Sequence, residues 1–219
     1  MRRECAIVVC SIVLVGMLSL VVGVQKVGAA GTVYIKPDGS VDPSAAPIQR
    51  SLDVYTLTGN ITSDETGIIV QASNIVVDGN GYTVQGIGAN VLNGFYLSSV
   101  NNVTIKNTSV KNFTSGISLS QSSYNTVTGN NIADSSNGVG VLIQFASSNN
   151  NVTDNCLTGN WEGIHLTSSG HNVILRNSIS GSVEGIHLVS SNYNSIASNN
   201  ISKNNAGASI SGHLRTVTA

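Results

Sequence analysis

The feature that most constrains the fold of this chain is a short repeat with a period near 22 residues. A glycine followed by an apolar residue, any residue and a second apolar residue recurs seven times, with successive glycines 27, 22, 24, 23, 22 and 22 residues apart. These glycines are Gly67, Gly94, Gly116, Gly140, Gly163, Gly185 and Gly207. Apolar residues at alternate positions over such a short stretch are typical of a short strand with one buried face.

A second string, with an apolar residue, two further residues, Asn, one residue and an apolar residue, lies between copies of the first. Its copies are Val127–Ile132, Val152–Leu157, Ile174–Ile179 and Ile196–Ile201, and Ile105–Val110 has Thr108 in place of the Asn. Gly and Asn tolerate the positive φ of a tight corner, so they are expected to separate the strands. One period therefore predicts three short strands and three corners, after which the chain returns to the same place one coil further along.

The predicted fold class is all-β, a right-handed parallel β-helix of about 22 residues per coil over residues 62–210. Apolar side chains from successive coils should stack about 4.8 Å apart into three ladders. The ladders are Ile105, Val127, Val152, Ile174 and Ile196; Val110, Ile132, Leu157, Ile179 and Ile201; and Leu119, Ile143, Leu166, Leu188 and Ile210. A fourth ladder, of amides at one corner, is expected from Asn130, Asn155, Asn177 and Asn199.

The two ends of the chain depart from the repeat. Residues 1–30 carry Arg2 and Arg3, an uncharged apolar run and small residues before Gly31, which predicts either a cleaved signal peptide or a retained N-terminal anchor. Residues 31–61 lack the repeat, hold all three prolines and are expected to cap the open end of the helix. Residues 211–219 form an off-pattern C-terminal tail, so we expect either missing coils or a partner covering the last coil.

Charge and cysteine content narrow the function. The chain has 10 Lys+Arg against 11 Asp+Glu and no basic run, which argues against nucleic acid as a partner. Beyond residue 30 the only cysteine is Cys156, so an intrachain disulfide is not expected. The predicted location is extracytoplasmic (secreted, cell-surface or periplasmic), with membrane contact only through the N-terminal segment.

The repeats resemble those of the pectin-lyase-like superfamily, and within it the chain is similar to NosD-type β-helix proteins of archaea and bacteria. The resemblance rests on the two strings and on the segments Gly31–Ser40, Tyr55–Asn60 and Asn74–Asn80. It implies a parallel β-helix. It also implies a choice of functions, because the superfamily includes polysaccharide lyases and hydrolases, surface proteins and NosD itself, which is linked to copper delivery.

The sharpest candidate site is a pair of matching segments. Glu162-Gly-Ile-His165 is followed 22 residues later by Glu184-Gly-Ile-His187, so the two Glu and the two His should stack one coil apart. Glu162 and Glu184 could act as the acid and the nucleophile of a retaining glycosidase. His165 and His187, with either Glu, could instead bind a metal such as copper or zinc. Duplication of one coil would also produce this pattern without any site.

Four aromatic residues, Trp161, Tyr96, Tyr124 and Tyr193, could stack on sugar rings or pack at corners. The acidic residues do not form the Asp clusters that, by resemblance, bind Ca²⁺ in pectate-type lyases. No cofactor is expected, and copper and calcium are the ions that could bind. The leading hypothesis is a non-catalytic exported module for cell-surface or carbohydrate interaction, with a polysaccharide or envelope glycan as partner. A polysaccharide lyase or glycoside hydrolase and a NosD-like copper-related periplasmic protein are the alternatives.

Overall fold

The computed structural model describes residues 29–87, 91–135, 138–211 and 214–218. All regular secondary structure within these ranges is β-strand. None of the described residues forms a helix able to cross a membrane. The predicted export segment, residues 1–30, lies outside the described residues except for its last two, which form β1 (Ala29–Ala30).

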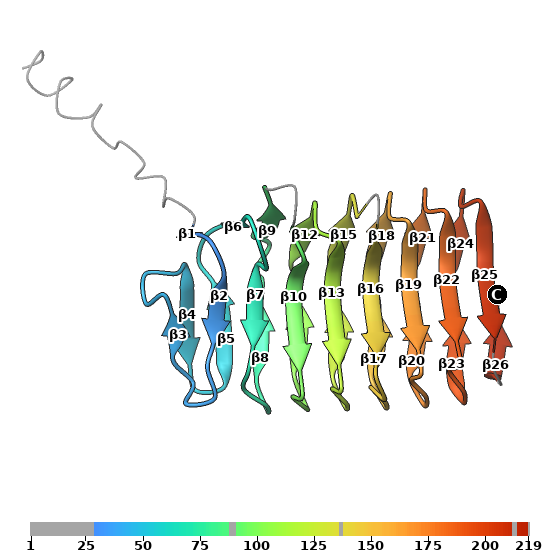
Figure 1. The fold of residues 1–219 in the computed structure, drawn as a ribbon, viewed down its shortest axis with the longest axis horizontal. Helices are drawn as coiled ribbons and strands as arrows, with labels where there is room; N and C mark the ends of the chain where they lie inside the picture. Colours follow the sequence, from blue (N-terminus) through green and yellow to red (C-terminus); the bar gives the residue numbers. More distant parts are fainter. Residues whose placement is uncertain (1–28, 88–90, 136–137, 212–213, 219) are drawn as a thin grey trace, which may run out of the picture.

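The strands form three sheets that run the length of the molecule (Figure 1). Sheet A contains β1, β6 (Ile61–Ser63), β9 (Thr83–Gly86), β12 (Ser109–Lys111), β15 (Asn131–Ala133), β18 (Cys156–Thr158), β21 (Ser178–Ser180) and β24 (Asn200–Ser202). Sheet B contains β3 (Val41–Asp42), β2 (Val33–Ile35), β7 (Ile68–Val70), β10 (Asn93–Ser98), β13 (Ser115–Ser120), β16 (Val139–Gln144), β19 (Glu162–Thr167), β22 (Glu184–Val189) and β25 (Ala206–Ser211). Sheet C contains β4 (Ile48–Ser51), β5 (Val54–Leu57), β8 (Val76–Asp78), β11 (Thr104–Lys106), β14 (Thr126–Thr128), β17 (Asn151–Thr153), β20 (Val173–Leu175), β23 (Asn194–Ala197) and β26 (Leu214–Thr218).

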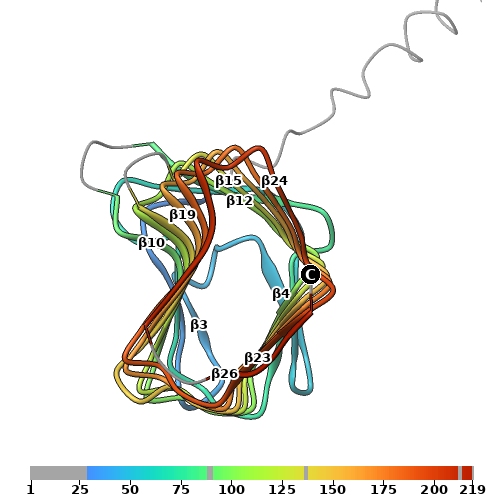
Figure 2. The same ribbon diagram turned by 90° about the vertical axis from the view of Figure 1, so that its right-hand side faces the viewer.

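The predicted parallel β-helix is confirmed. Each coil passes through sheets B, C and A in turn, and each strand pairs in parallel with its counterpart in the next coil. Viewed along the long axis, the coils superimpose on a common closed outline (Figure 2). The three predicted apolar ladders are all present, since their members are register partners in sheets C, A and B respectively.

These ladders form the core between the sheets. Ile105, Val152 and Ile174 are completely buried in one ladder, as are Leu119 and Leu166 in another. Burial stabilises the fold by about 1.5–3 kcal/mol for each such side chain. The core therefore supplies the stabilisation that disulfides do not.

The glycines of the repeat are required for a different reason from the one the sequence suggests. Gly163 does not have a positive φ. A Cβ atom there would lie 2.5 Å from the carbonyl oxygen of Gly185 in the next coil. Positive φ values occur at other corner residues, among them those one position before the stacked Asn: Gly129 (65°), Asp154 (57°) and Arg176 (54°). Close packing of successive coils thus selects the repeat glycines, while the left-handed corner conformation falls on the residues that precede the stacked Asn.

The predicted Asn ladder is confirmed, and a second one accompanies it. Each side-chain amide donates to the amide oxygen one coil further on, as from Asn155 to Asn177 at 3.0 Å. The second ladder lies at the corner between sheets B and C and consists of Asn125, Asn150, Asn172 and Asn194. Its spacing of 25, 22 and 22 residues matches that of the first ladder, so the periodicity could have revealed it.

The ends of the helix differ from the sequence-based expectation. Residues 31–61 include β3 and β4, which pair antiparallel at the edges of sheets B and C, but also β2 and β5, which already belong to the parallel sheets. Their buried alternate residues Val33 and Tyr55 place them in the coil although the glycine string is missing. At the other end, Leu214–Thr218 was expected to be off-pattern but pairs in parallel with β23 as β26.

Candidate metal centre

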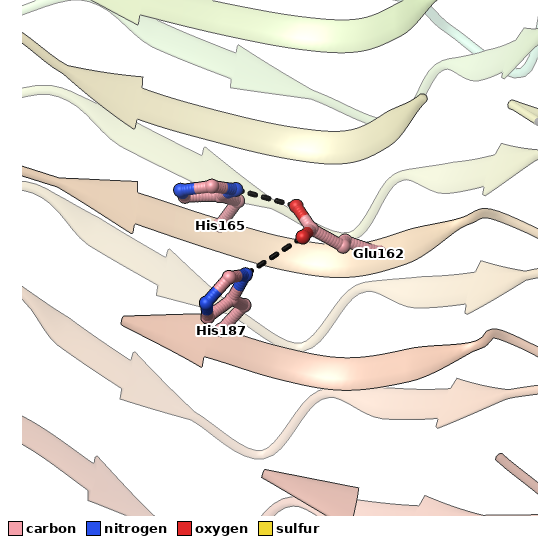
Figure 3. Close-up of side chains that lie close together, drawn as sticks. All are labelled: Glu162, His165 and His187. Carbon is pink, nitrogen blue, oxygen red and sulfur yellow. Dashed lines mark hydrogen bonds and ion pairs between the residues drawn. The ribbon is translucent and has the colours of Figure 1, made fainter. Parts of the chain in front are cut away.

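The matching segments lie side by side in sheet B. Strands β19 and β22 are parallel neighbours, with Glu162 paired to Glu184 and His165 paired to His187, as the 22-residue spacing predicts. Ile164 and Leu166, on either side of His165, are completely buried in the core, so His165 faces outward. Glu162 is the first residue of β19, and its carboxylate lies beside the two imidazole rings, with one oxygen directed at each ring (Figure 3).

The Glu162 carboxylate holds both histidines. Nδ1 of His187 donates to Oε1 of Glu162 at 2.7 Å, and Nδ1 of His165 donates to Oε2. The ring centroids are 4.7 Å apart, with the planes tilted by 44°. Glu162 is only 9% exposed, so its charge is largely removed from solvent and depends on the two imidazoles for its polar contacts.

Glu184 occupies a different environment although its sequence context is the same. Its Oε2 lies 3.5 Å from Nδ1 of His187, beyond hydrogen-bond distance. Among the described residues, this oxygen and Nε2 of His165 are buried side-chain atoms that have no hydrogen-bond partner. The cluster therefore contains polar atoms whose bonding capacity is not used.

Apolar and small residues surround the cluster along the sheet. In β16, Val139 pairs with Glu162 and Leu142 with His165. In β25, Ala206 pairs with Glu184 and Ser209 with His187. Among the described residues, the ion-pair partners of Glu162 and Glu184 are histidines, and none is a Lys or Arg. The two carboxylates are thus not neutralised by a fixed cation.

The donor set fits a transition metal. One ligand atom from each of Glu162, His165 and His187 can be chosen so that all three lie within 4.8 Å of one another. Zinc and copper bind imidazole nitrogen and carboxylate oxygen at about 2.0–2.2 Å, so small side-chain rotations would bring these donors onto one ion. Within the described part of the chain, Glu162, His165 and His187 are the His, Cys, Asp or Glu residues that bring three such ligand atoms this close together.

The four predicted aromatic residues do not all lie on one surface. Trp161 is half-exposed at the corner just before Glu162. Tyr96 lies in sheet B in the same outward row as His165, but three coils away. Tyr124 and Tyr193 are exposed at the corner between sheets B and C, where the ring of Tyr193 stacks on His171.

Two of the acidic residues elsewhere, Asp154 and Asp78, are each engaged in a single ion pair. Arg176 donates two hydrogen bonds of 2.7 Å to Asp154, and this contact holds the pKa of Asp154 below its ordinary value. Burial acts to raise the pKa of Asp78, but the backbone N–H of Asn80 and the ammonium of Lys106, among others, outweigh it and lower the pKa. These pairs join neighbouring coils at one corner and leave no carboxylate group resembling a calcium site there.

The architecture and the cluster together define a class: a parallel β-helix with a histidine–carboxylate group on the outer face of one sheet. The chain belongs to the NosD family, because the family model described as "Periplasmic copper-binding protein (NosD)" matches residues 47–217. This membership supports the extracytoplasmic location expected from the N-terminal sequence.

Solved structures and a curated relative are similar to this chain over parts of their length. The periplasmic alginate epimerase AlgG is 21% identical, with a TM-score of 0.57 over 73% of this chain and 40% of its own. A double mutant of AlgG gives 0.53 at 15% identity, over 87% and 70% of the two chains. A 3-dehydroshikimate dehydratase of Acinetobacter baylyi is 30% identical over 165 residues, 66% of this chain. The chain spans about a third of the dehydratase (32%).

Proposed function

We propose that this protein is a periplasmic, non-catalytic β-helix that binds a transition-metal ion, with copper the foremost candidate, through Glu162, His165 and His187. The observation that carries the proposal is the sharing of one nearly buried carboxylate by two outward-facing imidazoles from adjacent coils. The copper-binding description of the NosD family supports the choice of ion.

The residues divide the work of binding. The two imidazoles supply nitrogen donors suited to copper or zinc, and Glu162 supplies both an oxygen donor and a negative charge. A bound ion is cargo in this proposal, held at the surface of a rigid helix rather than used in a reaction. Because strands β19 and β22 are fixed in register by the sheet and the core ladder, the donors are preorganised.

Isothermal titration of the purified protein with Cu²⁺ and Zn²⁺ tests the proposal. We expect one ion per chain, and loss of that binding in the double variant His165→Ala, His187→Ala, since each imidazole provides one donor. The matched control is His171→Ala, because His171 is exposed at another corner and stacks on Tyr193. Equal affinity and stoichiometry in the double variant would remove the site, provided circular dichroism shows both variants folded.

The exposed aromatic residues favour carbohydrate interaction as a second candidate function. His171 and Tyr193 present stacked rings, with centroids 5.2 Å apart, at the corner that also carries Tyr124. Such flat faces suit sugar rings. A glycan array probed with wild type and with Tyr193→Ala would test this, and binding that is unchanged in the variant would rule out this corner.

A catalytic version of the carbohydrate hypothesis would use Glu162 and Glu184 as acid and nucleophile. Their pairing in register is compatible with it, but both oxygens of Glu162 already accept from imidazoles. Release of reducing ends from polysaccharide substrates, abolished by Glu184→Gln, would support this version.

A further inference from the structure

Glu184 adds a second carboxylate to the cluster, and one of its oxygens makes no hydrogen bond within the described residues. Its Oε2 is buried, makes no hydrogen bond within the described residues, and lies 3.5 Å from Nδ1 of His187. That nitrogen is also the one that bonds to Glu162. The unused oxygen therefore lies on the same side of the His187 ring as Glu162.

The charges of the cluster are unbalanced without a cation. Glu162 and Glu184 are register partners on adjacent strands, and like charges in that position repel each other. The described residues provide histidines, but no Lys or Arg, as ion-pair partners for them. Two carboxylates with two neutral imidazoles carry a charge of −2, which matches a divalent ion.

Sulfur is absent from this part of the molecule. Beyond residue 30 the chain has one sulfur-containing side chain, Cys156, which is exposed on β18 in sheet A, whereas the cluster lies on sheet B. Thiolate and thioether ligands select Cu⁺, while mixed nitrogen and oxygen ligands suit Cu²⁺ and Zn²⁺. The donor chemistry thus opposes a site for reduced copper.

Resting on the metal-binding function proposed above, we infer that Glu184 is a fourth donor and that the completed site of two nitrogens and two oxygens selects a divalent ion over Cu⁺. The ligand set consists of Nδ1 of His165 and His187 with one carboxylate oxygen each from Glu162 and Glu184. The register partners of Glu184 and His187 in the following strand, Ala206 and Ser209, are small and supply no competing charge. Coordination through Nδ1 would require each neutral imidazole to carry its proton on Nε2, so the hydrogen bonds from Nδ1 to Glu162 would be replaced by bonds to the ion.

Paired titrations of the full chain test this inference. Cu²⁺ binding is followed by calorimetry and by electron paramagnetic resonance, and Cu⁺ binding by anaerobic competition with bicinchoninate. We expect one Cu²⁺ per chain with nitrogen hyperfine coupling, weaker affinity for Cu⁺ than for Cu²⁺, and a loss of about tenfold or more in Cu²⁺ affinity for Glu184→Gln. The matched control Glu65→Gln changes an exposed carboxylate in a different coil and should leave the affinity unchanged.

The outcomes separate the two proposals. Tighter binding of Cu⁺ than of Cu²⁺, or an unchanged Cu²⁺ affinity in Glu184→Gln, overturns the inference while metal binding itself stands. Failure of the wild type to bind either copper ion or zinc overturns the proposed function and the inference together. Circular dichroism of Glu184→Gln, whose side chain is partly exposed, confirms that the variant is folded before its affinity is compared.

Discussion

Replacing Asn155 by Ala should destabilise the helix far more than an average polar substitution. The Asn155 side chain makes four hydrogen bonds: it accepts from the backbone and side-chain amides of Asn130, and donates to the carbonyl of Val127 and to Asn177. All four lie in a buried corner, where each net bond contributes about 1 kcal/mol and an abandoned partner costs about 1–3 kcal/mol. We therefore expect a loss of about 3–5 kcal/mol in the free energy of unfolding.

Urea denaturation followed by circular dichroism measures this loss. With an m value of about 2 kcal/mol/M, the midpoint should fall by about 1.5–2.5 M. The matched control is Asn151→Ala, four residues earlier, where the side chain is exposed and the change should stay within about 0.5 kcal/mol. If Asn155→Ala costs less than about 1 kcal/mol, or no more than the control, the amide ladder does not stabilise the corner as argued.

Two further predictions concern packing and pH. Gly163→Ala should lower the free energy of unfolding, measured by urea denaturation, by about 1–3 kcal/mol, because the new Cβ would lie 2.5 Å from the carbonyl oxygen of Gly185. The control Gly207→Ala places a Cβ with nothing within 4 Å and should be nearly neutral. Equal effects of the two substitutions would refute the close-packing argument. The lowered pKa of Asp78 means that its carboxylate stabilises the fold above the unfolded pKa of about 3.9, and that this contribution is lost as the pH falls through the lower folded value. The stability advantage of wild type over Asp78→Asn should therefore shrink between pH 7 and about pH 3, and a constant difference would contradict it.

The periodic part of the fold could be predicted from the sequence because each coil repeats one local rule. A residue such as Val127 is apolar at a fixed place in the period, and its partners Ile105 and Val152 follow from the spacing alone. The start of the helix could not be predicted in this way. Val33 and Tyr55 belong to the parallel sheets without the glycine string, since burial of alternate side chains is enough to add a strand.

The candidate site was predicted in part. The spacing of 22 residues places His165 over His187 and Glu162 over Glu184, and the structure confirms both pairings. The asymmetry within the pair was not visible in the two identical strings. Glu162 bonds both imidazoles while Glu184 keeps an unused oxygen, although the two residues have different register partners only on their outer sides, Val139 in β16 and Ala206 in β25.

The sequence alone thus determines the coil, its ladders and the stacking of like residues. A constant number of residues per coil places equivalent residues in register, and burial of their apolar side chains stabilises that register. The tertiary structure alone decides which stacked groups share a contact and which remain unpaired. Such choices are made across strands that are 22 residues apart in the chain, at distances of a few ångströms that periodicity does not encode.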